Sequence, residues 1–257
     1  MTMLSAWPTA APFAGITLLE LEITSPAGLP GDMTRGDWLA VITDSSALGI
    51  PRLRLFGGEP TVHPNWREFA ELALALGMGV EVYSNLRTVR EPWWELFTRD
   101  CVRLGTSYHS DDPEEHDEIT GEPGSYVRTR CNIREAVRRG VVLRARIVAS
   151  LPGQRVAGAR AELESMGVKD ITTPDGTYGR CTQGRARVLS NGDLAGCAPA
   201  RDLPVGDVRT APIGTLLGGS AWTGLSARTP PRPAGCHPDK DGSDCAPAET
   251  DACNPAY

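Results

Sequence analysis

The chain has 257 residues, of which 23% are charged and 40% are hydrophobic, proportions typical of a soluble globular protein. Its formal net charge of −6 argues against broad electrostatic binding to nucleic acid or to anionic membranes. No apolar run approaches the roughly 20 residues of a membrane span, and residues 1–15 lack the basic start of a signal peptide, so we expect a cytoplasmic protein.

Segments with strand and helix patterns alternate through the first two thirds of the chain. Residues 17–24 alternate apolar and acidic side chains with the two-residue period of a strand. Thr34 and Asp37 have the spacing of a capping box, and Gly49 marks the end of the helix that they begin. Further strands are predicted at residues 52–56, 80–83, 102–108, 141–150 and 170–173. Further helices are predicted at about 65–76, 93–97, 131–139 and 156–166.

This alternation predicts right-handed βαβ units and a parallel sheet. About six strands are too few for a closed eight-stranded barrel, so an α/β fold with either a partial (βα)6 TIM-like barrel or a doubly wound sheet fits residues 1–173. In both architectures ligands bind at the carboxyl ends of the strands. Residues 57–59, 84–85 and 107–109 follow such ends, which favours a ligand site there.

The turn after the second predicted strand is Gly57-Gly58-Glu59-Pro60. Glycines at a strand end let a ligand approach the backbone, and a carboxylate beside them can accept hydrogen bonds from an ammonium group. Pro60 sets the backbone angle of the exit. An ordinary strand-to-helix turn is the alternative interpretation.

The last third of the chain changes character, and we expect a small second domain over residues 174–257. It is rich in Gly, Pro and Asp, and it holds five of the seven cysteines: Cys181, Cys197, Cys236, Cys245 and Cys253. In a reducing compartment such crowding favours metal or cluster ligation, which would also stabilise a domain with so little apolar periodicity. Residues 185–193 are predicted to form a hairpin that brings Cys181 and Cys197 together. Four thiolates suit structural zinc as well as an iron–sulfur cluster.

Taken in order, these segments resemble the radical S-adenosylmethionine (SAM) enzymes that carry a C-terminal SPASM or twitch domain and often modify peptides. The matching segments are residues 19–25, 56–61, 82–85, 107–117 and 121–126. The resemblance covers nearly the whole chain. It implies a partial barrel with a small cysteine-rich C-terminal domain, and SAM and [4Fe–4S] clusters as cofactors.

The resemblance also assigns residues to the SAM site. The Gly57-Gly58 backbone and Glu59 would hold the amino group of SAM, with Pro60 completing the turn. Ser84, Asn85 and Ser107 would contact its ribose or carboxylate, although capping of the next helix is an alternative for Ser84 and Asn85.

The four histidines and two isolated cysteines carry no assigned role. We expect His109 to be a solvated loop residue, with a catalytic base as the alternative, and His63 and His116 to lie at the surface. Cys101 and Cys131 are expected to be buried structural thiols. No catalytic residue is assigned.

The spacing of Cys181, Gly192 and Cys197 resembles the opening of a SPASM-type auxiliary site, which Cys236, Cys245 and Cys253 would complete. The fuller pattern includes a tight Cys-x-x-Cys that this chain lacks, so one auxiliary [4Fe–4S] cluster is expected rather than two.

One departure from the family concerns the loop after the first strand. Its members carry Cys-x-x-x-Cys-x-x-Cys there, and the three thiolates hold the cluster that cleaves SAM. In this chain residues 26–32 contain no cysteine. Cys101 is expected at the far end of its strand and Cys131 on an outer helix, so neither replaces the loop. Reductive cleavage of SAM should then fail in the chain as given, which leaves open whether it is an enzyme.

The leading hypothesis is a radical SAM/SPASM-like oxidoreductase that modifies a ribosomal peptide by 5′-deoxyadenosyl radical hydrogen abstraction. Its partners would be a precursor peptide or protein and a cellular electron donor, with no nucleic acid and no membrane. The alternative is a catalytically degenerate member that acts as a metal-stapled peptide-binding or partner protein. A zinc-stapled α/β protein with unrelated chemistry is a third hypothesis.

Overall fold

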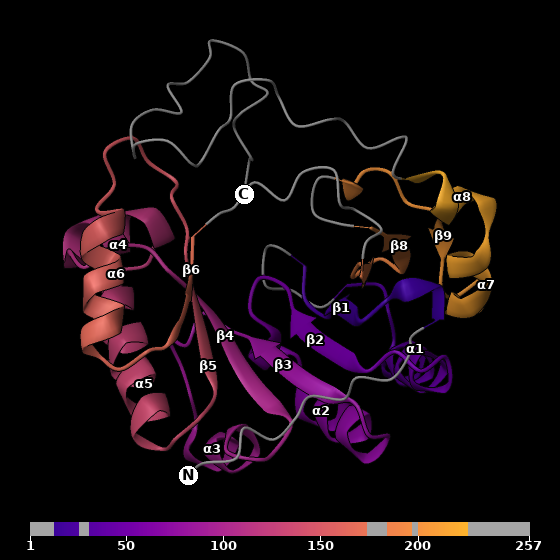
Figure 1. Cartoon of the computed structure of the whole chain (residues 1–257), viewed down its shortest axis with the longest axis horizontal. Helices are drawn as coiled ribbons and strands as arrows, with labels where there is room; N and C mark the ends of the chain where they lie inside the picture. The colour runs from indigo at the N-terminus through magenta and orange to yellow at the C-terminus, as the bar shows by residue number, and fades with distance from the viewer. Residues whose placement is uncertain (1–12, 26–30, 174–183, 197–199, 226–257) are drawn as a thin grey trace.

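The computed structural model describes residues 13–25, 31–173, 184–196 and 200–225. Its strands form one sheet in the order β6-β5-β4-β3-β2-β1-β7-β8-β9, and the helices cover the outer face of that curved sheet (Figure 1). The strands are β1 (Leu18–Glu22), β2 (Arg52–Phe56), β3 (Gly79–Tyr83), β4 (Val102–Tyr108), β5 (Leu143–Ile147), β6 (Asp170–Thr172), β7 (Arg185–Val188), β8 (Asp193–Ala195) and β9 (Gly206–Asp207). The helices are α1 (Arg35–Ala47), α2 (Trp66–Ala75), α3 (Glu91–Phe97), α4 (Pro113–Thr120), α5 (Ser125–Arg138), α6 (Val156–Ser165), α7 (Ile213–Gly218) and α8 (Ser220–Thr223), with short 3-10 turns η1 (Phe13–Gly15) and η2 (Pro60–Val62).

Strands β1 to β7 run parallel, and the six predicted strands are all present. Leucines and valines on the helix side of the sheet, such as Leu21, Leu55 and Val82, are completely buried. They pack with the apolar faces of α1, α2 and α3 into the hydrophobic core. The apolar positions in the sequence therefore position the strands whose carboxyl ends form the candidate site.

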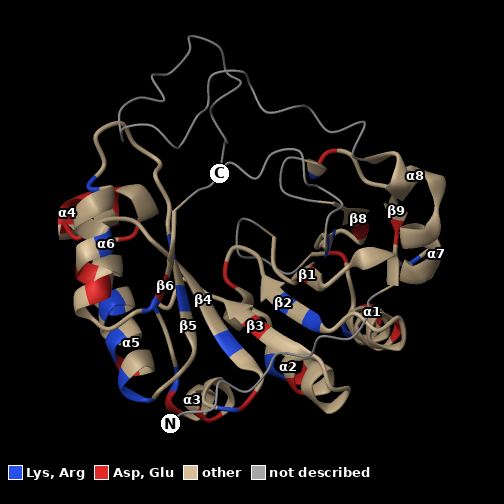
Figure 2. Cartoon of the chain, viewed as in Figure 1, with Lys and Arg blue, Asp and Glu red and all other residues tan. Residues whose placement is uncertain are grey.

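The opposite, inner face of the sheet is charged rather than apolar. Neighbouring strands place Arg187, Glu20, Arg54, Glu81 and Arg103 directly opposite one another in register, with the signs alternating. Arg54 Nη2 lies 2.8 Å from a Glu81 oxygen, and Arg187 Nη2 lies 2.7 Å from a Glu20 oxygen. Figure 2 shows blue segments on β2 and β4 that belong to this face. The alternation of apolar and acidic residues in β1 thus reflects a strand buried on both faces.

The starts of α1 and α4 follow local capping chemistry. At α1 the Asp37 N–H donates to Thr34 Oγ1 (3.2 Å) and the Thr34 N–H donates to the Asp37 carboxylate (2.8 Å), which confirms the predicted capping box. Helix α4 was not predicted, because its sequence is mostly acidic and has no long apolar period. It begins where Asp112 accepts hydrogen bonds from the amides of the first turn, at 3.0 Å each.

The last third of the described chain continues the same sheet. Strand β7 pairs with β1 in parallel and with β8 in antiparallel, so the predicted hairpin is confirmed. Gly192 takes a φ of 92° in its turn, a value that favours glycine. One sheet thus includes the strands between residues 18 and 172 and those between residues 185 and 207, and the division into two domains after residue 173 stays a prediction.

None of the helices in the described ranges combines the length and the apolar character that crossing a membrane requires.

Candidate functional site

The turn after β2 is held against the end of β1. Gly57 has a φ of 145°, which side-chain-bearing residues rarely adopt, and a Cβ on it would lie 2.2 Å from the carbonyl oxygen of Thr24. The Gly58 N–H donates to the carbonyl of Ser25 at 3.0 Å. The two glycines therefore differ: close packing against Thr24 requires glycine at position 57, whereas Gly58 is exposed.

Glu59 joins the ends of β2 and β3. Its Oε1 accepts from the Thr61 N–H (3.0 Å) and hydroxyl (2.6 Å). Its Oε2 accepts from the Ser84 hydroxyl (3.0 Å) and the Asn85 N–H (2.8 Å). A carboxylate has about four lone-pair positions, and all four are used here. The predicted contact of Glu59 with an ammonium group stays a prediction, and in the structure this carboxylate fixes the two turns relative to each other.

Ser84 and Asn85 form a turn of their own at the end of β3. The Ser84 hydroxyl accepts from the Leu86 N–H (3.1 Å) and the Asn85 side chain accepts from the Arg87 N–H (2.8 Å). From α5, Thr129 donates to the carbonyl of Asn85 at 3.0 Å. The alternative that these residues cap the next helix is wrong, because α3 begins at Glu91 with Arg90 in the cap position.

Ser107 lies one strand further along, at the end of β4. Its hydroxyl pairs with the Tyr83 hydroxyl at 3.0 Å, whereas Ser84 and Asn85 bond to Glu59. Burial raises the pKa of Tyr83 above its usual value, so the phenol stays protonated. Gly105 leaves room for this ring, since a Cβ there would lie 2.4 Å from it. The structure thus brings residues 57–60, 84 and 85 into one bonded cluster, with Ser107 and Tyr83 beside it on the inner face.

The histidines behave differently from expectation. His116 is 1% exposed and His63 is 6% exposed, so the prediction that they lie at the surface is wrong. His109 is partly buried, and its Nδ1 has no hydrogen-bond partner in the part of the chain that the structure describes. The rings of His109 and His116 are 5.2 Å apart, and His116 also contacts Tyr108 and Tyr126. Glu162 accepts from both tyrosine hydroxyls, which completes a polar cluster behind the end of β4.

This histidine pair should make folding sensitive to acid. Burial, and next the nearby His116, lower the pKa of His109 to about 4 from an ordinary value of 6.5. Between these values the unfolded chain takes up a proton that the folded chain does not. The free energy of unfolding should therefore fall by about 1.4 kcal/mol per pH unit below pH 6.5 on account of this residue.

The measurement is urea unfolding of the protein and of His109→Gln between pH 7 and pH 5. The variant should lose the slope that belongs to one proton. An unchanged slope would mean that His109 titrates normally in the folded protein.

The cysteines divide into two groups. Cys181, Cys197, Cys236, Cys245 and Cys253 lie outside the described residues, so the predicted metal site stays a prediction. Cys101 immediately precedes β4 at its amino end and is half-buried, and Cys131 is exposed on α5, so the expectation of a buried thiol is wrong for Cys131. Within the described ranges no group of three or more His, Cys, Asp and Glu side chains could hold a metal.

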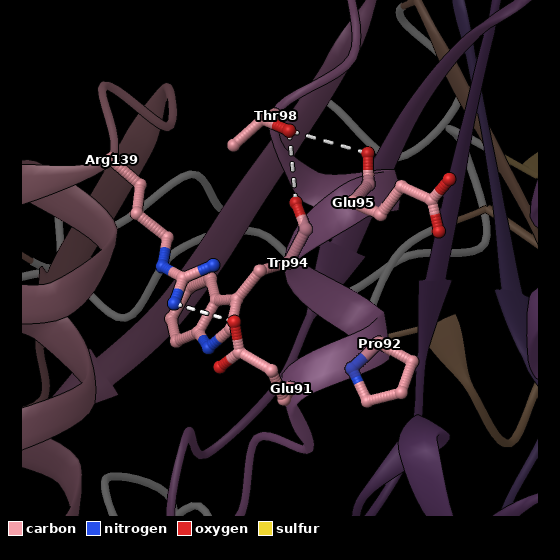
Figure 3. Close-up of a pocket in the computed structure, with 6 residues that line it drawn as sticks. All are labelled: Glu91, Pro92, Trp94, Glu95, Thr98 and Arg139. Carbon is pink, nitrogen blue, oxygen red and sulfur yellow. Dashed lines mark hydrogen bonds and ion pairs between the residues drawn. The ribbon is translucent and has the colours of Figure 1, made fainter.

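A cavity of about 460 Å³ lies on the outer surface between α3 and the end of α5 (Figure 3). Two of its charged groups pair with each other, since Arg139 donates to Glu91 at 2.8 Å, and the Arg139 guanidinium lies 5.2 Å from the Trp94 ring centre. None of the predicted site residues lines this cavity, and no function is assigned to it.

Known proteins with similar sequences depend on SAM. No profile of a known protein family matches the chain. An S-adenosylmethionine-dependent nucleotide dehydratase from a Thermoplasmatales archaeon is 24% identical over 107 residues, 42% of this chain and 39% of that protein. The AdoMet-dependent heme synthase of Methanosarcina barkeri is 28% identical over 132 residues, 51% of this chain and 38% of that protein. The chain thus matches well under two thirds of these relatives' lengths.

Solved structures with the same fold match most of the chain. Streptococcus suis SuiB bound to S-adenosylmethionine has a TM-score of 0.69 at 10% identity, covering 83% of this chain and 68% of its own. SuiB bound to its precursor peptide SuiA has a TM-score of 0.70 at 10% identity, with 83% and 67% covered. The protein anSMEcpe with bound AdoMet and a peptide has a TM-score of 0.64 at 11% identity, with 81% of each chain covered. These likenesses concern the fold, a partial barrel as predicted.

Proposed function

We propose, from the resemblance of this chain to the radical SAM enzymes in sequence and in fold, that it binds SAM at the carboxyl ends of β2 and β3 and serves the modification of a precursor peptide. The finer proposal is a SPASM-type oxidoreductase. The observation that carries the SAM site is the Glu59 carboxylate, which bonds the Gly57–Pro60 turn to Ser84 and Asn85. A peptide substrate is supported by neighbours whose structures contain peptides.

Within this site the residues divide the work. Gly57 lets the turn pack against Thr24, and Gly58 is exposed without a side chain, which suits close approach of an amino acid moiety. Glu59 acts as a positioning residue, because its lone pairs are already used by Thr61, Ser84 and Asn85. The ammonium group of SAM would then be met by backbone carbonyl oxygens of the turn. When bound and reductively cleaved, SAM supplies a 5′-deoxyadenosyl group that can abstract hydrogen.

The described residues do not fit a cluster that would deliver the electron for this cleavage. Residues 26–32 contain no cysteine. Cys101 lies at the amino end of β4, away from the turn after β2, and Cys131 is exposed on α5. No step is therefore assigned to a SAM-bound cluster, and the auxiliary cluster at Cys181, Cys197, Cys236, Cys245 and Cys253 remains part of the proposal.

Calorimetry with SAM on anaerobically prepared protein tests the binding site. Glu59→Gln should weaken binding by about tenfold, because the amide nitrogen cannot accept the hydrogen bonds that hold one of the two turns. Glu68→Gln is the matched control, because Glu68 lies on α2 in an exposed ion pair with Arg35 of α1. This variant should bind SAM normally. No heat of binding with the unmodified protein would remove the SAM proposal.

Iron and sulfide content after anaerobic reconstitution tests the radical chemistry. About eight irons per chain would mean two four-iron clusters and would support the oxidoreductase. About four irons, lost on Cys181→Ala or Cys197→Ala, would leave only the auxiliary cluster. The chain would then be the degenerate, metal-stapled partner protein, and the expected readout would be peptide binding without 5′-deoxyadenosine.

A further inference from the structure

A second polar cavity lies at the amino ends of the strands, opposite to the proposed SAM site. It has a volume of about 180 Å³, and five arginines line it: Arg52, Arg54, Arg103, Arg144 and Arg185. Only one carboxylate, that of Glu81, lines it with them. The arginines come from four strands, β2 (Arg52 and Arg54), β4, β5 and β7, and most lie near the amino end of their strand, so the barrel itself gathers them.

The surplus of positive charge persists when neighbouring ion pairs are counted. Arg54 binds Glu81 and Glu20, and Arg144 binds Asp170 at 3.0 Å, so two of the five arginines pair with carboxylates. Arg52 donates to neutral oxygens only, the Thr17 carbonyl (3.0 Å) and hydroxyl (2.9 Å). Among the described residues neither Arg52 nor Arg185 has a carboxylate within ion-pair distance.

The proximity of like charges shows in the acid–base behaviour of these arginines. Burial lowers the pKa of Arg52, and the positive charges of Arg54, Arg144 and Arg185 lower it further against the opposing effect of Glu81. Burial and then Arg144 lower the pKa of Arg103 as well. An anion in this cavity would relieve the repulsion between guanidiniums.

The cavity also contains an acceptor that lacks a donor. Glu81 is 6% exposed, and its Oε2 accepts two hydrogen bonds from Arg54, at 2.9 and 2.8 Å. Its Oε1 is buried and has no hydrogen-bond partner within the described ranges, the nearest Arg144 nitrogen being 4.0 Å away. A buried carboxylate oxygen without a donor is costly, so a ligand that donates one hydrogen bond here would be favoured.

We propose that this cavity binds a phosphate-class oxyanion that still carries a proton, with its oxygens on the arginines and its O–H donated to Glu81 Oε1. A planar guanidinium can donate two parallel hydrogen bonds to two oxygens of such an oxyanion. A cavity of 180 Å³ exceeds the roughly 30 Å³ share of one water several times and can hold a tetrahedral anion. Sulfate has the same shape but no proton at neutral pH, so Glu81 discriminates against it. The site is independent of SAM.

The test measures binding of inorganic phosphate, a phosphate monoester and sulfate to the full chain, by calorimetry at constant ionic strength and neutral pH. Phosphate should bind at least about tenfold more tightly than sulfate, because only phosphate satisfies Glu81. Arg185→Gln and Arg52→Gln should each weaken phosphate binding by about tenfold or more. Glu81→Gln should reduce the preference over sulfate, since its amide can donate to either anion.

Controls separate a built site from general screening of charge. Arg160→Gln removes an exposed arginine that pairs with Glu164 on α6, and it should leave phosphate binding unchanged. Tighter binding of the monoester than of inorganic phosphate would identify the phosphoryl group of a larger molecule as the ligand, and the reverse order would identify the free ion. Equal responses to phosphate and sulfate that persist in folded Arg185→Gln would overturn the proposal, as would no binding at millimolar phosphate.

Discussion

Replacing Gly57 by alanine is expected to weaken SAM binding by about a hundredfold and to lower the free energy of unfolding by about 2–4 kcal/mol. The new Cβ would lie 2.2 Å from the carbonyl oxygen of Thr24 and 2.3 Å from its hydroxyl, at a φ of 145° that alanine disfavours. The turn must shift, and Gly58 then loses its hydrogen bond to Ser25. Urea unfolding and calorimetry with SAM measure the two effects.

Gly77→Ala is the matched control for this substitution. Gly77 ends α2 with a φ of 79°, but a Cβ on it would meet nothing within 4 Å. It should cost about 1 kcal/mol through backbone strain alone and leave SAM binding intact. Equal stability losses in the two variants, with normal SAM binding by Gly57→Ala, would show that contact with Thr24 does not constrain the turn.

Replacing Glu20 by glutamine is expected to lower the free energy of unfolding by about 3–5 kcal/mol. Glu20 is 1% exposed and lies between Arg54 and Arg187, so its loss leaves two largely buried guanidiniums without their shared counter-charge. Burial alone would raise the pKa of Glu20, but Arg187 and Arg54 outweigh it and the pKa is lowered. Urea unfolding at neutral pH measures the loss.

The sign of the pH dependence follows from the lowered pKa. The stabilisation by Glu20 is complete above its ordinary value of 4.5 and disappears as the pH falls through its folded value, so protein and variant should converge in acid. Glu68→Gln, which breaks an exposed pair with Arg35, should lower the free energy of unfolding far less, because water screens that pair. A similarly small loss for Glu20→Gln would mean that water screens the inner face of the sheet.

Much of the fold follows from local patterns in the sequence. Apolar periodicity predicted the strands at 52–56 and 102–108 to the residue, and the Thr34–Asp37 capping box marked the start of α1. The resemblance to radical SAM enzymes is confirmed by SAM-dependent relatives and by structures of the same fold. Helix α4 was not predicted from the sequence, because its stability comes from the Asp112 cap and from tertiary contacts rather than from an apolar stripe.

The candidate site was predictable in position but not in detail. Because ligands bind at the carboxyl ends of parallel strands, the sequence predicted that residues 57–60, 84 and 85 lie in one site. The four hydrogen bonds to Glu59 were not predictable, because they depend on how two turns meet in space. Burial of His116 likewise depends on Tyr108 and Tyr126, which lie at separate places in the chain. The arginine cavity was missed because its five arginines lie on four strands, and no local motif joins them.

The pairing of β7 with β1 also bears on how the chain acquires its structure. Leu18 meets Arg185 in register, and Thr17 bonds to Gly184 across 167 residues of sequence. Strand β1 therefore waits for the synthesis of β7 before its second edge is covered. Contacts of such long range close slowly, because the loop entropy is lost before they form. Until then β1 presents an open strand edge, the kind of surface through which chains aggregate during synthesis.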